Sequence, residues 1–233
     1  MLKVFDKPAG LTTHTSLSST DLPRPDIDPI DSFIGHISHR SGLKLWPAHR
    51  LDVGTTGVLL ATDDADEAAE LSKLFEDRAV EKTYFFITDR PSETETKTTS
   101  ATSEFRVESF IDRQNGGRDS NFFSAPPTTD RSVNAITDFT FVREKDGFTL
   151  WRAKPKTGRP HQIRLHAESV GLSILGDLAH GGSEFPVLCL HAATVKFEWK
   201  NETIEVEAKN PRWFDDLDLL SPLKSSQLLR WLA

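Results

Sequence analysis

The sequence predicts an α+β fold, a largely antiparallel, mixed sheet core with flanking helices and loops. Short segments rich in aromatic and β-branched residues outnumber helical segments and follow one another directly along the chain. Two pairs of these segments are joined by tight-turn signals, Asp-Gly at 146–147 and Lys-Asn-Glu at 200–202, which is typical of antiparallel hairpins. With 233 residues, 37% of them hydrophobic, and no internal repeat, we expect a single domain over 1–233.

The first part of the chain predicts a strand, a turn, a loop and a helix. Leu2 to Phe5 reads as a short strand, followed by a turn in which Pro8 fixes φ and Gly10 permits tight geometry. The Ser-, Asp- and Pro-rich stretch 18–29 reads as a loop. A helix is then expected from an Asp31 N-cap to Gly42.

A buried strand, an amphipathic helix and a second strand are expected next. Val58 to Thr62 is a continuous apolar run of strand length. Asp63 or Asp64 is expected to cap the helix that follows. Its inward stripe consists of Ala68, Leu71, Leu74 and Phe75. Thr83 to Thr88 has the composition of another strand.

The second half of the chain begins with a polar insertion and continues with hairpins. Residues 89–132 are poor in apolar side chains and are expected to be extended and partly mobile, with one strand, Glu104 to Ile111. The elements expected after it are a hairpin of 137–142 with 148–154, a helix over 161–170 closed by Gly171, a hairpin of 192–199 with 203–208, and an amphipathic helix over 221–232.

Composition excludes several classes of protein. No apolar run approaches the ~20 residues of a membrane span, and the N-terminus shows no basic start followed by an apolar stretch. The single cysteine, Cys189, cannot form an internal disulfide, which favours the cytoplasm. The net charge of −7 argues against a general polyanion binder, but residues 143–166 are locally basic.

Four motifs stand out in order along the chain: KPAGL at 7–11, HRLDVGTTG at 49–57, KTY at 82–84 and TGRPHQIRLH at 157–166. In this combination the sequence resembles the RluA-type pseudouridine synthases, which convert a uridine in RNA to its C-glycoside isomer. The similarity extends through HQIRLHAESVGLSILGD and LHAATVKF, so it covers most of the chain. Thr56 and Pro160 depart mildly from the family pattern, and we expect a stand-alone catalytic domain without an S4-like RNA-binding domain.

The resemblance implies a catalytic aspartate at Asp52, an active-site tyrosine at Tyr84 and an arginine, Arg164, that pairs with the aspartate. A carboxylate can attack C1′ of the sugar, assist loss of the C2′ hydrogen, or attack C6 of the ring, and all three routes need an ionised, positioned oxygen. Pairing with Arg164 would keep that oxygen charged. The Tyr84 ring can stack on an extruded uracil while its hydroxyl handles the C5 proton, although a strand tyrosine packed in the core is the plain alternative.

The remaining candidate residues are expected to bind substrate. Arg50 matches a residue that fills the gap left by the extruded uridine, with a surface arginine on a turn as the alternative. Ile163 resembles the apolar residue beneath the base. Lys7, Arg159 and His161 are interpreted as phosphate or scaffold contacts. The resemblance implies RNA, ribosomal or transfer, as the partner, and no metal or organic cofactor. We expect a monomer without an obligate protein partner.

Two other functions stay open at this point. A catalytically silent RNA-binding module of the same fold would keep the motifs without the reaction. A metal-dependent hydrolase would draw its ligands from His49, Asp52, Asp63, Asp64, His161 and His166. Helix capping explains Asp63 and Asp64 better, and the sequence contains no H-x-x-x-H or C-x-x-C pair.

Overall fold

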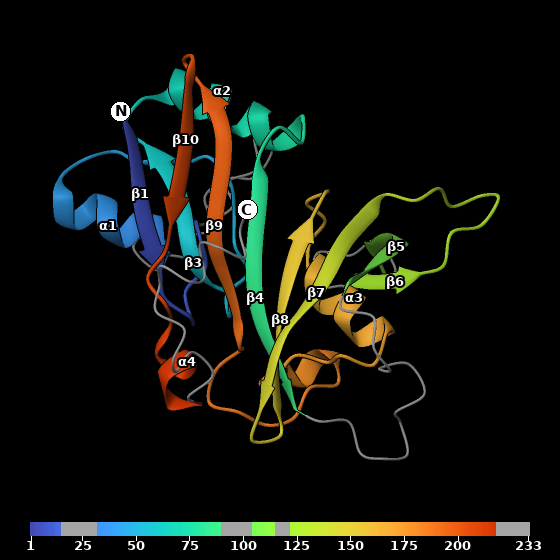
Figure 1. Ribbon diagram of the computed structural model, residues 1–233. Helices are drawn as coiled ribbons and strands as arrows, with labels where there is room; N and C mark the ends of the chain where they lie inside the picture. The colour runs from blue at the N-terminus through green and yellow to red at the C-terminus, as the bar shows by residue number, and fades with distance from the viewer. Residues whose placement is uncertain (15–31, 90–103, 115–121, 218–233) are drawn as a thin grey trace.

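The computed structural model describes residues 1–14, 32–89, 104–114 and 122–217. The strands form one large sheet in which the order is β1-β3-β9-β4-β8-β7-β5-β6, with β2 and β10 paired to β3 and β9 (Figure 1). The elements are β1 (Leu2–Lys7), α1 (Phe33–Ser41), β2 (Trp46–Pro47), β3 (Thr56–Thr62), α2 (Ala65–Glu76), β4 (Glu81–Asp89), β5 (Glu104–Arg113), β6 (Phe122–Ala125), β7 (Ala135–Lys145), β8 (Phe148–Pro155), α3 (Gln162–Ser169), the 3₁₀ turn η2 (Leu178–His180), β9 (Leu190–Trp199), β10 (Glu202–Glu207) and α4 (Arg212–Asp216).

The sheet is mixed and mostly antiparallel, which confirms the expected fold class. Every strand pairing among the described residues is antiparallel except that of β3 with β9. At this parallel junction Gly57 has φ +110°, and a Cβ there would lie 2.1 Å from the carbonyl oxygen of Ala192. Only glycine therefore allows β3 and β9 to approach so closely.

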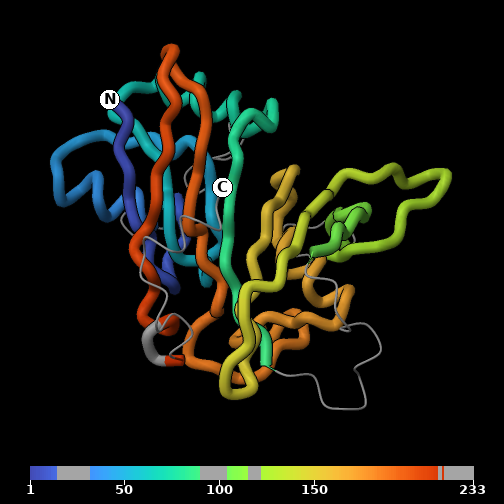
Figure 2. The backbone as a smooth tube through the Cα atoms, viewed as in Figure 1, coloured from blue at the N-terminus to red at the C-terminus, as the bar shows by residue number. Residues whose placement is uncertain are grey.

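The two predicted hairpins form with left-handed residues in their turns. Asp146 and Gly147 have φ of 51° and 86° between β7 and β8, and Lys200 and Asn201 have φ of 52° and 66° between β9 and β10. Two successive positive φ values match the right-handed twist of the flanking strands. Figure 2 shows both hairpins as tight reversals of the chain at the ends of long strands.

Side chains from both halves of the chain build the core. The largest buried cluster joins residues of β4, β7, β8, α3 and β9 with Trp213 and Phe214 of α4, and Phe86 at its centre is fully buried. A second cluster packs the apolar stripe of α2 against β3, β9 and β10. Among the described residues, none of the helices combines the length and apolarity that crossing a bilayer requires.

Several expected boundaries need correction. The N-cap of α1 is Ser32, whose hydroxyl accepts from the Gly35 N–H at 3.1 Å, rather than Asp31. Asp64 caps α2, whereas Asp63 pairs with Lys3 at 3.0 Å. The described part of 89–132 contains two strands, β5 and β6, where one was expected. The loop expected at 18–29 and the helix expected at 221–232 lie outside the described residues.

Candidate active site

The loop that carries Asp52 is held by hydrogen bonds from the segment that follows β1. The Thr13 hydroxyl donates to the Leu51 carbonyl and accepts from the Leu51 N–H, both at 2.9 Å. The Gly10 N–H donates to the carbonyl of Val53 at 2.9 Å. The residues on both sides of Asp52 are therefore held by the backbone-directed contacts of one segment, and the carboxylate is positioned before any substrate arrives.

Lys7 belongs to this scaffold. Its ammonium is fully buried and donates to the carbonyls of Pro8, Val53 and Thr55 at 2.9, 3.2 and 3.0 Å. Burial lowers the pKa of Lys7 to about 8, and the charge of Asp52 opposes that shift. All three donors of the ammonium are used on the loop, which fits the scaffold role of the two roles expected for Lys7.

Tyr84 lies on β4 beside an irregularity in the sheet. The register of β4 against β9 shifts between Thr83 and Tyr84, and the half-buried Tyr84 lines the same cleft as Asp52. Burial, and then the charge of Asp52, raise the pKa of Tyr84 well above its ordinary value. The phenol is therefore neutral at physiological pH and lies within electrostatic reach of the carboxylate.

Arg164, on α3, faces two carboxylates. Its Nη1 lies 3.7 Å from Oδ2 of Asp52, and its Nε and Nη2 donate to both oxygens of Asp177 at 2.6 and 2.7 Å. Burial opposes the charged form, but the hydrogen bonds and negative charges of Asp177 and Asp52 together outweigh it and raise the pKa of Arg164. Asp177 thus orients the guanidinium that lies beside the Asp52 carboxylate.

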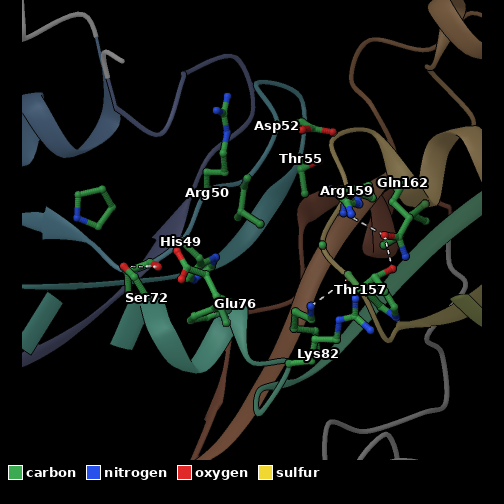
Figure 3. Close-up of a pocket in the computed structure, with 18 of the residues that line it drawn as sticks. His49, Arg50, Asp52, Thr55, Ser72, Glu76, Lys82, Thr157, Arg159 and Gln162 are labelled. Carbon is green, nitrogen blue, oxygen red and sulfur yellow. Dashed lines mark hydrogen bonds between the residues drawn. The ribbon is translucent and has the colours of Figure 1, made fainter. Parts of the chain in front are cut away.

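These groups open into one cleft with a volume of about 940 Å³. Asp52, Tyr84, Ile163 and Arg164 all line it. In Figure 3 the Asp52 carboxylate points toward the wall that carries Arg159 and Gln162, whereas Arg50 extends in another direction. A cleft of this size accommodates a nucleotide together with part of its neighbours.

The remaining predicted residues lie on the walls of this cleft. Arg50 and Arg159 are exposed, and Arg159 also donates to the Asn134 carbonyl at 3.3 Å. His161 has φ +53° at the start of α3, and its Nδ1 lies 3.2 Å from Nε2 of His180. Ile163 is 6% exposed and joins the main core. Every predicted site residue except Lys7 lines the cleft, and Lys7 contacts the Asp52 loop from within the protein.

The six residues that a metal-dependent hydrolase would use do not converge. No group of three His, Cys, Asp or Glu side chains among the described residues could hold a metal ion. His49 accepts the Leu60 N–H at 3.1 Å and stacks on Phe75, and both ring nitrogens of His166 are engaged by the hydroxyls of Ser109 and Thr137. These histidines are structural.

The sequence predicted no role for two residues of the site, Asp177 and Gln162. Asp177 ends the family-like stretch HQIRLHAESVGLSILGD, so its position offered a signal, but no role was assigned to it. Gln162 is buried, and its Oε1 accepts from the Thr157 hydroxyl at 2.7 Å and from the Arg159 N–H at 3.0 Å. It therefore fixes the loop before α3, as Figure 3 shows.

Comparison with known proteins gives a consistent picture. The family model described as RNA pseudouridylate synthase matches residues 2–169. Ribosomal large subunit pseudouridine synthase D of Borreliella burgdorferi is 30% identical over 188 residues, which are 76% of this chain and 51% of that protein. Ribosomal large subunit pseudouridine synthase C of Rickettsia felis is 32% identical over 227 residues, 92% of this chain and 67% of that protein. This chain spans about half the length of the Borreliella relative.

A solved structure supports the fold. Human RNA Pseudouridylate Synthase Domain Containing 4 superposes with a TM-score of 0.65 at 24% identity, over 95% of this chain and 89% of that one. The motifs, the mixed sheet and the family match over 2–169 agree. This chain is a member of the RNA pseudouridylate synthase family.

Proposed function

We propose that this protein isomerises specific uridines in structured RNA to pseudouridine, with Asp52 as the reacting carboxylate, Tyr84 and Arg164 as its catalytic partners, and 1–233 acting as one catalytic domain. The observation that carries the proposal is the meeting of these three side chains in one cleft, with Arg164 3.7 Å from Asp52. A guanidinium at that distance favours the ionised carboxylate that every route of attack requires.

The reaction would proceed on an extruded base. The uridine must leave its stack because its reacting atoms are inaccessible inside a helix, and Arg50 on the exposed rim is placed to fill the gap. Asp52 then assists cleavage of the glycosidic bond, by attack at C1′ or C6 or by assisting loss of the C2′ hydrogen. Ile163 offers an apolar surface beneath the detached base while it turns.

Tyr84 would act in the last step. Once C5 has joined the ribose, its hydrogen must leave, and the neutral phenol oxygen can accept that proton while passing its own to the Asp52 carboxylate; N1, released from the ribose, takes up a proton in exchange. The raised pKa of Tyr84 means that the hydroxyl enters this step protonated. The step needs no external oxidant or reductant, because the overall reaction is an isomerisation.

The names of the two bacterial relatives point to large-subunit ribosomal RNA as the first substrate to test, with transfer RNA as the alternative. We propose that the protein acts in the cytoplasm as a monomer. Exposed Arg159 and half-buried His161, which both line the cleft, are candidates for contacts with RNA.

The test is release of tritium from transcripts labelled at C5 of uridine, in the presence of EDTA. Persisting release supports the synthase. Binding without release from any cellular RNA favours the silent module, and release or cleavage that EDTA abolishes favours the metal enzyme. Asp52→Asn should abolish release while its thermal unfolding and RNA affinity stay near those of the unaltered protein; turnover by this variant would contradict the role of Asp52.

A further inference from the structure

Arg78 occupies a backbone position that suits glycine. It follows the end of α2, has φ +61°, and its N–H donates to the Phe75 carbonyl at 3.2 Å, while Ala79 N–H donates to the Leu74 carbonyl at 2.9 Å. Helices commonly end with a left-handed residue there, and glycine adopts it freely, whereas other residues pay about 1 kcal/mol or more. An arginine at this position therefore costs stability that glycine would not.

Arg78 lines the same cleft as Asp52 and Tyr84, and so does Lys82 of β4, four residues further along the chain. The Lys82 ammonium is half-buried and donates to the Thr157 carbonyl at 3.2 Å (Figure 3). Burial, and then the charge of Arg78, lower the pKa of Lys82 to about 8. The two like charges therefore lie within electrostatic reach of each other in the lining of one cleft.

No carboxylate relieves this repulsion. Among residues 1–14, 32–89, 104–114 and 122–217, neither Arg78 nor Lys82 forms an ion pair, and Glu76 lines the cleft without pairing with either. The cleft holds five arginines and lysines against two carboxylates, although the chain as a whole carries −7. The cationic residues are Arg50, Arg78, Lys82, Arg159 and Arg164. The wall at the junction of α2 and β4 therefore presents an unsatisfied pair of positive charges to the cleft.

A phosphodiester has the chemistry that this pair requires. A guanidinium fork binds two non-bridging oxygens of a phosphate, and an ammonium adds a point charge beside it. Lys82 lies two residues before Tyr84 on the same strand, so an anion held at Lys82 has a fixed offset from the phenol. A nucleotide extruded toward Tyr84 must bring its own backbone to a wall of the cleft.

We propose that Arg78 and Lys82 form a phosphate-binding site that holds the RNA backbone beside the extruded uridine and so sets the register of the strand against Asp52 and Tyr84. This inference rests on the proposed function and assigns a place to one phosphodiester of the substrate. Arg78 and Lys82 are positioning residues, because they touch the backbone and leave the reacting atoms to other groups.

The test uses the full chain and a fluorescein-labelled oligouridylate, with binding followed by anisotropy at several KCl concentrations. Arg78→Gly should raise Kd about tenfold. The slope of log K against log [salt] should become shallower by about 0.7, the value for one lost phosphate contact to a single strand. Lys82→Gln should act in the same direction, and Arg78→Lys should lose less affinity than Arg78→Gly.

Thermal unfolding separates this role from a structural one. Because glycine suits the left-handed position, Arg78→Gly should unfold at the same temperature as the unaltered protein or higher. The matched control is Lys196→Gln, which removes an exposed lysine paired with Glu205 outside the cleft and should leave Kd unchanged. Unchanged Kd and salt slope in both Arg78→Gly and Lys82→Gln would overturn the proposal.

Two further measurements complete the design. Inorganic phosphate at constant ionic strength should not displace the oligonucleotide; displacement that Arg78→Gly abolishes would assign the pair to free phosphate and overturn the RNA assignment. Tritium release, measured in parallel, reports on the proposed function separately. Its absence from the unaltered protein would refute the synthase while the binding data still decide the phosphate site.

Discussion

Replacement of Asp177 by Asn should destabilise the protein strongly, because Asp177 compensates a buried positive charge. The side chains of Arg164 and Asp177 are 12% and 1% exposed, and two hydrogen bonds of 2.6 and 2.7 Å join them. Asp177→Asn removes the negative charge and turns one acceptor into a donor that faces the guanidinium. Breaking a buried pair from one side costs about 3–5 kcal/mol.

The negative charge of Asp52 reduces this loss of stability. Asp52 lies 3.7 Å from Nη1 of Arg164 and still supplies one negative charge, so we expect the lower end, about 3 kcal/mol. For a chain of this size, that corresponds to a fall in Tm of about 10 °C. The assay is urea denaturation at neutral pH followed by the fluorescence of the five tryptophans.

A pair with the same geometry but greater exposure serves as the control. Arg106 also makes two hydrogen bonds with one carboxylate, that of Asp138, at 2.6 and 3.1 Å, but its side chain is 53% exposed. Asp138→Asn should therefore cost less than about 1 kcal/mol. Equal losses at the two positions, or a loss below about 1 kcal/mol at Asp177, would refute the reasoning from burial.

Three further predictions test the hydroxyl, a buried histidine and a strand junction. Tyr84→Phe should slow or stop the reaction after the base has detached, as seen by tritium release in single turnover; an unchanged rate would remove the hydroxyl from the mechanism. His166 is fully buried, and burial lowers its pKa to about 4. Because the unfolded chain takes up this proton below pH 6.5, stability falls with acidification, and His166→Gln should remove about 2 kcal/mol of the loss between pH 7 and 4.5; an unaltered pH slope would contradict this. Gly57→Ala, with φ +110° and its Cβ 2.1 Å from the Ala192 oxygen, should cost about 3 kcal/mol or more, and a normal urea midpoint would show that β3 and β9 separate easily.

Local signals were sufficient for most of the fold. The hairpin turns at 146–147 and 200–201 and the capped helix after Asp64 depend on a few adjacent residues, and each was predictable. β6 was missed because its four residues follow a polar stretch and owe their strand to pairing with β5. The short α4 depends on packing of Trp213 and Phe214 into the core, which no local pattern reveals.

The candidate site was predictable where a motif carried it. Asp52, Tyr84 and Arg164 were expected from three separated motifs, and the fold brings them to one cleft; their chemical roles stay predictions. The sequence left Lys7 open between a phosphate contact and a scaffold contact, since the burial of a lysine beside a turn depends on the folded chain. The contact of Asp177 with Arg164 likewise depends on how the chain after α3 folds back.

The placement of β9 has a consequence for the order in which the protein is made. β9, Leu190–Trp199, lies between β3 and β4 in the sheet. β3 follows the Asp52 loop directly, and β4 carries Tyr84. During synthesis on the ribosome, Asp52, Tyr84 and Arg164 are therefore all made before β9, the strand that separates β3 from β4. We therefore expect the proposed active site to form late in synthesis, after residues distant in sequence have come into contact.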